Sequence, residues 1–217
     1  MLYKNLCFAL VLMIILGSCN TGDKKHYVTV ETDYGDMTFE LYNSTPVHRD
    51  NFLSLIKQNF YDDLLFHRVI RGFMIQGGDP DSKGAPKGQN LGMGGPGYTL
   101  PAEIGSPHFK GTLAAARTGG PSNPTKRSSG SQFYIVQGNV QIESGLLQMA
   151  QQKGINYNQT QIQKYTSIGG TPSLDMEYTV FGEIVDGMDV IDKIAAMPTG
   201  PTDRPLEDVK MKIRIGR

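Results

Sequence analysis

The sequence predicts an all-β, or β-rich, fold that carries two helices. The chain contains 26 glycines among its 217 residues, which indicates many turns. Apolar runs of strand length follow one another between these turns, and the last run, 209–215, alternates between apolar and charged residues. With 39% hydrophobic residues the chain can bury a core, and its length indicates one domain with a modest insertion.

The first predicted element is a β-hairpin. Val28 and Val30 alternate with polar residues before a glycine-containing turn at 33–36, and Met37 and Phe39 alternate after it. Further strands are expected over 65–76, 111–116, 132–137, 178–185 and 209–215, with a Gly/Pro-rich loop over 77–101. In the last strand the apolar residues Val209, Met211, Ile213 and Ile215 are expected to point inward.

Two helices are predicted, one after the first hairpin and one before the last strand. The first begins at Pro46, because a proline at the first helical position loses no hydrogen bond, and Thr45 is its expected cap. The second is short and begins after Asp186, which is expected to cap it.

The segment 141–171 does not fit the β-rich pattern. It is rich in glutamine, its apolar residues have helical spacing, and Asn158 is expected to cap a short helix that ends at Gly169 and Gly170. We interpret it as a helical pair inserted on the surface of the β-rich domain. Two hypotheses remain open: a decorative insertion without function, or an element that lies close to a binding groove.

The N-terminus has the features of an export signal. Lys4 precedes eleven consecutive apolar residues, 6–16, a run too short to span a bilayer but suited to a signal peptide. Residues 16–19, with the sequence Leu-Gly-Ser-Cys, resemble the lipobox of bacterial lipoproteins. The resemblance implies a signal peptide over 1–18, a lipid on Cys19 and a lipidated tether over 19–26. An ordinary cleavage site with an incidental cysteine is the alternative.

Composition and cysteine usage exclude several classes of function. Lys plus Arg and Asp plus Glu both number 21, so no net charge attracts the chain to nucleic acid. Cys7 leaves with the signal peptide and Cys19 takes the lipid, so the folded domain has no thiol for a disulfide or a zinc site. The four histidines lack metal-ligand spacing. We expect no metal, no cofactor and no nucleic-acid partner.

The stretch 66–79 carries the most informative chemistry. If the strand stays regular, Arg68, Met74 and Gln76 share one face and place a guanidinium beside an apolar group and an amide. A lone arginine on a strand is usually solvated, but this strand leads into a glycine-rich loop. His67 is interpreted as a packed or hydrogen-bonded strand residue and not as a general base.

This stretch resembles the signature of the cyclophilins, and two further segments match that family in the same order. They are 130–135, with the sequence GSQFYI, and 174–182, with the sequence LDMEYTVFG. The resemblance extends over 28–215, apart from the insertion, and is closer to bacterial members. It implies that 27–217 form a closed, eight-stranded antiparallel β-barrel capped by a helix at each end. It also implies peptidyl-prolyl cis–trans isomerase activity on X–Pro bonds.

Rotation about an X–Pro bond is slow because amide resonance sets a barrier of about 20 kcal/mol. A guanidinium can stabilise the twisted amide by donating to its nitrogen, and it stays protonated at neutral pH. Because side chains fill the interior of an eight-stranded barrel, the site is expected on the outer face. The resemblance implies catalytic roles for Arg68 and Gln76 and substrate-binding roles for Phe73, Met74, Ala116, Arg117, Gln132, Tyr134, Leu174 and Tyr178.

Two departures from the family pattern concern this pocket. Tyr134 stands where many relatives have phenylalanine, so a hydroxyl is expected at the pocket. Ser173 stands where the family's tryptophan contributes to cyclosporin binding, so we predict weak sensitivity to that drug.

The sequence therefore predicts an isomerase that assists the folding of exported, proline-containing polypeptides. We expect a monomer in the cell envelope, anchored to a bacterial membrane through Cys19, with its domain facing the periplasm or the exterior. A non-catalytic chaperone module that binds proline peptides on the same scaffold is the alternative.

Overall fold

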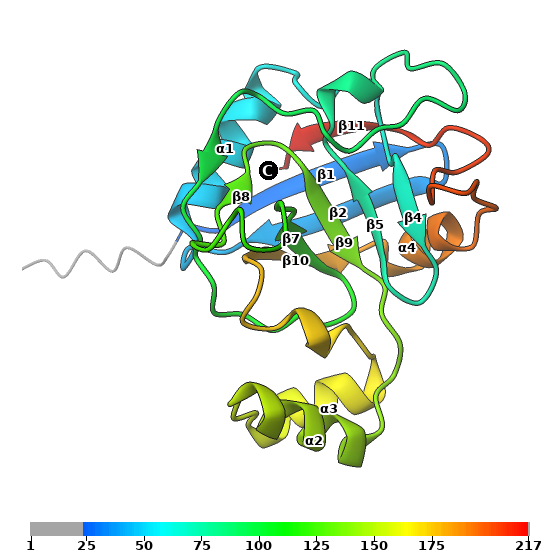
Figure 1. Ribbon diagram of the computed structural model, residues 1–217. Coiled ribbons are helices and arrows are strands. Elements are labelled where there is room, and N and C mark those ends of the chain that lie inside the picture. Colours follow the sequence, from blue (N-terminus) through cyan, green and yellow to red (C-terminus); the bar gives the residue numbers. More distant parts are fainter. Residues whose placement is uncertain (1–23, 217) are drawn as a thin grey trace, which may run out of the picture.

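One curled antiparallel sheet forms the body of the protein (Figure 1). The computed structural model describes residues 24–216, so the predicted signal peptide and Cys19 lie outside the described residues. The sheet has nine strands in the order β3-β11-β1-β2-β10-β7-β9-β5-β4. Their bounds are β1 His26–Thr32, β2 Gly35–Leu41, β3 Leu64–Leu65, β4 Arg68–Ile70, β5 Met74–Gly77, β7 Thr112–Ala115, β9 Phe133–Val136, β10 Val180–Asp186 and β11 Lys210–Ile215.

The sheet curls until the chain itself joins its two end strands. β3 and β4 stand at opposite ends of the strand order, yet only Phe66 and His67 separate them in sequence. The Phe66 N–H continues the pairing of β3 by donating to the Val209 carbonyl oxygen at 2.9 Å. Counted as one interrupted strand, β3 and β4 reduce nine strands to the eight of the predicted barrel. The predicted β-rich barrel is confirmed.

The inward face of the first hairpin agrees with the alternation in the sequence. β1 pairs with β2 from His26 opposite Leu41 to Thr32 opposite Gly35, which leaves a two-residue turn. Val28 and Phe39 are fully buried in the barrel core. On β11 the same prediction is wrong for Ile215, which is 45% exposed because it ends the strand at the rim of the barrel.

Residues 65–76 do not form one continuous strand. β4 and β5 make a hairpin whose turn is closed by the Phe73 N–H, which donates to the Ile70 carbonyl oxygen at 3.0 Å. Gly72 in this turn has a φ of 77°, a conformation that glycine adopts without the steric cost of a Cβ. Arg68 lies opposite Gln76 and Ile70 opposite Met74. Directly paired residues of antiparallel strands point to the same side. Arg68, Met74 and Gln76 therefore share one face, as predicted, although the strand is interrupted.

Helices α1 (Pro46–Lys57) and α4 (Met188–Ala195) pack at opposite ends of the barrel (Figure 1). Pro46 is the first residue of α1, as predicted, but the Thr45 side chain makes no cap. Instead, the carboxylate of Glu103 accepts the N–H groups of Val47 at 3.1 Å and His48 at 3.0 Å. This acceptor comes from a distant loop, so local sequence gave no sign of it.

The predicted cap of α4 is also wrong. Asp186 is the last residue of β10, and Gly187 occupies the cap position with a φ of 85°. A Cβ at Gly187 would lie 2.1 Å from the carbonyl oxygen of Asp36. The close approach of the two chains therefore requires a glycine here.

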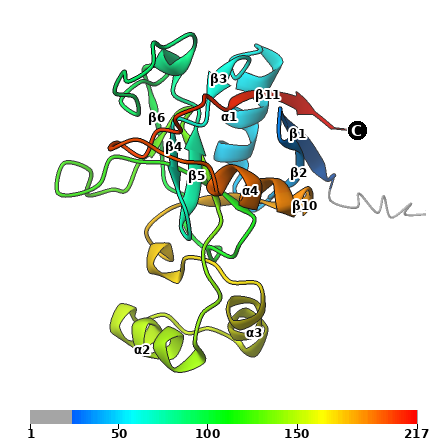
Figure 2. The same cartoon turned by 90° about the vertical axis from the view of Figure 1, so that its right-hand side faces the viewer.

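The segment 141–171 contains two helices, α2 (Glu143–Lys153) and α3 (Gln159–Ser167), beyond one end of the barrel (Figures 1 and 2). Asn158 caps α3 as predicted: its side chain accepts the Gln161 N–H at 2.9 Å, and the Gln161 side chain accepts the Asn158 N–H. Leu146 and Tyr165 of this pair form a small core with Phe109 of the barrel.

Short elements complete the described chain. They are the two-stranded sheet of β6 (Thr99–Leu100) with β8 (Ser128–Ser129), and the 3₁₀-helices η1 (Pro80–Ser82) and η2 (Pro172–Leu174). Within residues 24–216 no helix combines the length and the hydrophobicity that crossing a bilayer requires.

Replacing Glu103 with alanine removes the acceptor for the first turn of α1. We expect the free energy of unfolding to fall by about 2 kcal/mol, the upper end of the cost of losing a helix cap, in urea titrations of the full-length chain. Glu207→Ala is the matched control, since Glu207 is 77% exposed and its ion pair with Lys87 lies in solvent. Equal losses in the two variants would contradict the capping role.

Candidate active site on the outer face of the barrel

The β4–β5 hairpin divides its side chains between the interior and the exterior of the barrel. Val69 and Ile75 pair with each other and belong to the barrel core. Arg68, Met74 and Gln76 therefore face outward, since neighbouring strand residues point to opposite sides. A guanidinium, an amide and apolar groups thus lie side by side on one outer surface.

A second apolar cluster covers this outer surface, and we call it the outer apolar cluster. Its buried members include Met74 from β5, Tyr134 from β9 and Ala116 after β7. Its partly exposed members include Phe73 and Leu174. Six of the ten predicted site residues belong to it: Phe73, Met74, Ala116, Tyr134, Leu174 and Tyr178.

Two cavities lie on this side of the barrel, and the larger one shares Ala116 with the outer apolar cluster. The larger one, of about 990 Å³, we call the main groove, and Ala116, Arg117 and Gln132 are among its lining residues. The smaller one measures about 230 Å³ and is lined by Arg68. Gln76 lines both cavities. Because Ala116 and Gln76 are shared, the structure brings all ten predicted residues into one continuous region.

Hydrogen bonds fix the orientation of the two glutamine side chains. The Gln132 Nε2 donates to the carbonyl oxygens of Gly92 at 2.9 Å and Gly94 at 2.8 Å. Its Oε1 can therefore only accept, and it does so from the Gln76 Nε2 at 3.0 Å. Within the described residues, the Gln76 Oε1 accepts no hydrogen bond. That oxygen is therefore an available acceptor on a residue that lines both cavities.

Arg68 lies directly opposite Gln76 in the hairpin. Its side chain is 43% exposed, and its Nε lies 3.4 Å from the Asp203 Oδ2. The Val69 N–H donates to the Asp203 carbonyl oxygen at 2.8 Å, which fixes that loop against β4. A guanidinium has five N–H donors, so one long contact leaves most of them for a ligand.

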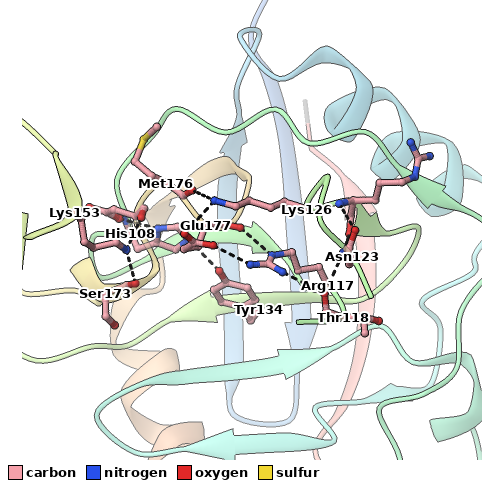
Figure 3. A network of polar contacts seen from close by, with 12 residues as sticks. His108, Arg117, Thr118, Asn123, Lys126, Tyr134, Lys153, Ser173, Met176 and Glu177 are labelled. Atoms are coloured by element: carbon pink, nitrogen blue, oxygen red, sulfur yellow. Dashed lines mark hydrogen bonds and ion pairs between the residues drawn. The ribbon is translucent and has the colours of Figure 1, made fainter. Parts of the chain in front are cut away.

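The Arg117 side chain lines the main groove and is held in place by several polar contacts (Figure 3). Its Nη2 lies 3.0 Å from a Glu177 carboxylate oxygen, its Nε donates to the Glu177 carbonyl oxygen at 2.9 Å, and its side chain is 9% exposed. The guanidinium lies 4.5 Å from the centre of the Tyr178 ring, which meets the Tyr134 ring edge-on. Three planar groups, those of Arg117, Tyr178 and Tyr134, thus pack against one another in series.

The backbone of Ala116 is partly engaged in hydrogen bonds within the protein. Its N–H donates to the Gln132 carbonyl oxygen at 2.9 Å, and its own carbonyl oxygen accepts from the Ser129 N–H at 2.7 Å. The second lone pair of that carbonyl remains for a peptide N–H.

The prediction that the Tyr134 hydroxyl lies at the pocket is wrong. The Tyr134 hydroxyl oxygen lies 2.9 Å from the His108 Nε2, and the His108 side chain is fully buried. Burial also raises the pKa of Tyr134 well above its ordinary value, so the hydroxyl stays protonated. The Tyr134 hydroxyl is therefore directed to a buried partner behind the outer apolar cluster.

Sequence reasoning missed the residues behind Tyr134. His108 bonds to Asp175 as well as to Tyr134, and these partners are 67 and 26 residues away along the chain. Asp175 belongs to the signature segment 174–182, but the resemblance implies no role for it. No spacing rule connects such distant residues, so their grouping follows from the fold alone.

His67 is packed, as predicted, but neither ring nitrogen makes a hydrogen bond within the described residues. It lines the smaller cavity together with Arg68. In the described part of the chain, no three His, Cys, Asp or Glu side chains are grouped so as to hold a metal ion.

The fold and this site define a β-barrel enzyme with an arginine beside an apolar surface. Residues 27–214 match the family described as "Cyclophilin type peptidyl-prolyl cis-trans isomerase/CLD". The chain belongs to the family of cyclophilin-type peptidyl-prolyl cis–trans isomerases. This confirms the resemblance and the class of enzyme that the sequence predicted.

Individual relatives agree with this assignment. A Staphylococcus aureus protein named "Putative peptidyl-prolyl cis-trans isomerase" is 39% identical over 183 residues, which cover 84% of this chain and 87% of the relative. A crystal structure of a Cryptosporidium parvum cyclophilin-type peptidyl-prolyl cis–trans isomerase has a TM-score of 0.63 and 26% identity, and the match covers 89% of this chain and 99% of the other. Another structure of that protein, in the presence of the dipeptide Ala-Pro, has a TM-score of 0.61 with 27% identity, and the match covers 88% and 99%.

Burial lowers the pKa of His67 to about 4, because the charged imidazolium loses its hydration. The unfolded chain binds this proton near pH 6.5 and the folded chain only near pH 4. The stability from neutral His67 is therefore complete above about pH 6.5 and is lost as the pH falls towards 4.

Between pH 7 and pH 5 we expect His67 to lower the free energy of unfolding by about 2 kcal/mol. His67→Phe keeps a ring of similar size that binds no proton. The free energy of unfolding of this variant should therefore differ between pH 7 and pH 5 by about 2 kcal/mol less than that of the unaltered chain. Urea titrations at pH 5, 6 and 7 measure this. A variant with the same pH dependence as the unaltered chain would show that His67 is not the titrating group.

Proposed function

We propose that this chain catalyses X–Pro rotation in exported proteins and so assists their folding, acting as a single chain. The observation that supports this best is the register of the β4–β5 hairpin, which sets Arg68 directly opposite Gln76. The next outward pair of the same hairpin, Ile70 and Met74, belongs to the outer apolar cluster. A hydrogen-bond donor and an apolar surface are thus adjacent, as a proline amide requires.

In this proposal the proline ring packs on Phe73, Met74 and Leu174. The Arg68 guanidinium donates to the amide nitrogen, which becomes pyramidal and basic only when the bond is twisted. A hydrogen bond that forms only in the twisted state lowers the barrier without tightening the ground state. No nucleophile or base takes part, because no covalent bond breaks.

The flanking peptide lies along the main groove. The Gln76 Oε1 accepts a peptide N–H, and the Ala116 carbonyl oxygen accepts another through its second lone pair. Fixing the peptide on one side of the proline lets the other side rotate alone. The Cryptosporidium parvum structure in the presence of Ala-Pro supports a proline-containing ligand for this family.

Replacing Arg68 with alanine should lower kcat/KM for the tetrapeptide Ala-Ala-Pro-Phe about a hundredfold in a protease-coupled assay. That factor corresponds to a charged hydrogen bond of about 2–3 kcal/mol in the transition state. Arg71→Ala is the matched control, because Arg71 is exposed and lines a different cavity. Equal rates for Arg68→Ala and the unaltered chain would make the catalytic assignment wrong, and retained peptide binding would then favour the non-catalytic chaperone.

We also propose that a lipid on Cys19 anchors the chain to the membrane of a bacterial cell envelope, with the domain outside the cytoplasm. The resemblance of residues 16–19 to a lipobox supports this. Each buried CH₂ of an acyl chain contributes about 0.8 kcal/mol, so several chains would hold the protein stably.

Replacing Cys19 with serine should move the protein from the membrane pellet to the soluble fraction of bacterial cells that express the full-length chain. Cys7→Ser is the matched control and should leave the protein in the pellet, because Cys7 belongs to the predicted signal peptide. A Cys19→Ser variant that still sediments with the membrane after a salt wash would contradict the lipid anchor.

A further inference from the structure

Asp175 forms hydrogen bonds both with the helical insertion and with His108 of the barrel domain. Its side chain is 4% exposed. Its Oδ2 accepts hydrogen bonds from the hydroxyls of Tyr157 at 2.5 Å and Tyr165 at 2.6 Å. Its Oδ1 accepts from the backbone N–H of His108 at 2.7 Å and contacts the His108 Nδ1 at 2.8 Å. Four donors thus satisfy the two oxygens of one buried carboxylate.

This arrangement determines which nitrogen of His108 carries the proton. A carboxylate with four contacts of this kind can only accept, so the His108 Nδ1 is the donor to Asp175. Burial lowers the pKa of His108, which keeps the imidazole neutral. The Nε2 of a neutral imidazole protonated at Nδ1 is an acceptor, so the Tyr134 hydroxyl donates to it at 2.9 Å.

A continuous series of hydrogen bonds therefore runs from the insertion to the site. Figure 3 shows its last two members, His108 and Tyr134. Tyr165 lies in α3, and Tyr157 lies in the loop between α2 and α3. At its other end the series reaches the ring of Tyr134 in the outer apolar cluster.

The end of α2 strengthens the same connection. The Lys153 Nζ donates to the carbonyl oxygens of Ser173 and Asp175, both at 2.7 Å (Figure 3). These residues flank Leu174, another member of the outer apolar cluster. Both helices of the insertion thus hold groups directly behind the proposed proline pocket.

We propose that the insertion positions the Tyr134 ring for proline binding and rotation, acting through Asp175 and His108. This rests on the proposed function, because the Tyr134 ring belongs to the same outer apolar cluster as Phe73, Met74 and Leu174, on which the proline is proposed to pack. Tyr157 and Tyr165 are then positioning residues, because they touch Asp175 and not the substrate. A phenylalanine at 134 would have no hydroxyl to bond with His108. The insertion can therefore position the ring at 134 only when that residue is a tyrosine.

A double-mutant cycle on the full-length chain tests the coupling. Tyr157→Phe with Tyr165→Phe removes both donors to the Asp175 Oδ2 while keeping both rings. We expect kcat/KM for Ala-Ala-Pro-Phe to fall about fivefold. In the Tyr134→Phe background, where the bond to His108 is already absent, the same pair of changes should lower it by less than about 1.5-fold. Multiplicative losses, with the pair costing fivefold in both backgrounds, would overturn the proposal.

Stability effects are separated by control measurements. Tyr27→Phe removes a tyrosine hydroxyl bonded to Glu40 far from the site and should leave kcat/KM unchanged. Urea titrations establish that each variant is folded at the assay temperature, and Tyr157→Phe alone serves if the paired variant unfolds. A purely structural role would lower stability and leave kcat/KM of the folded fraction unchanged.

Two further readouts do not depend on turnover. The same cycle is measured on the Kd of the tetrapeptide by NMR titration, so a chain that binds without catalysis still reports the coupling. If the proposed function is wrong, Arg68→Ala and the unaltered chain will have equal rates. If this proposal is wrong, the cycle will show no coupling between Tyr134 and the Tyr157/Tyr165 pair. The ¹⁵N shifts of His108 should show Nδ1 protonated and Nε2 unprotonated at pH 7, and the reverse tautomer would contradict the series of hydrogen bonds.

Discussion

The register of the β4–β5 hairpin is the constraint on which the site depends. Pairing Arg68 with Gln76 turns both side chains outward, while Val69 and Ile75 between them enter the barrel core. A shift of one residue would exchange the two faces and bury the guanidinium. The burial of Val69 and Ile75 therefore fixes the position of the arginine, so stability and activity require the same register.

The remainder of the site is arranged around this hairpin by connections that are long in sequence. β9 pairs with β5 and carries Tyr134, and the turn after β7 brings Ala116 and Arg117 to the main groove. Gln132 and Arg117 are each fixed by several hydrogen bonds, so the peptide-binding surface is formed before a ligand arrives. Such preorganisation favours binding because little side-chain entropy is lost.

Local patterns in the sequence predicted those features that depend on neighbouring residues. The alternation around Val28 and Phe39 gave the first hairpin, and Asn158 gave the start of α3, because both signals act over a few residues. The turn at Gly72 was missed, since the apolar run continues through it. The carboxylate of Glu103 and the contacts of Asp175 were also missed, because they join segments that only the fold brings together. The ten site residues came from the family resemblance, and spacing alone predicted only the face shared by Arg68, Met74 and Gln76.

The central claim is that the outer face of this barrel lowers the barrier to X–Pro rotation. NMR exchange spectroscopy on Ala-Ala-Pro-Phe, with a small molar fraction of the full-length chain, measures the cis–trans exchange rate directly. The account predicts a rate that rises in proportion to the protein while the cis:trans ratio of the free peptide stays constant. Shifted or broadened peptide signals without faster exchange would show binding alone and would contradict it.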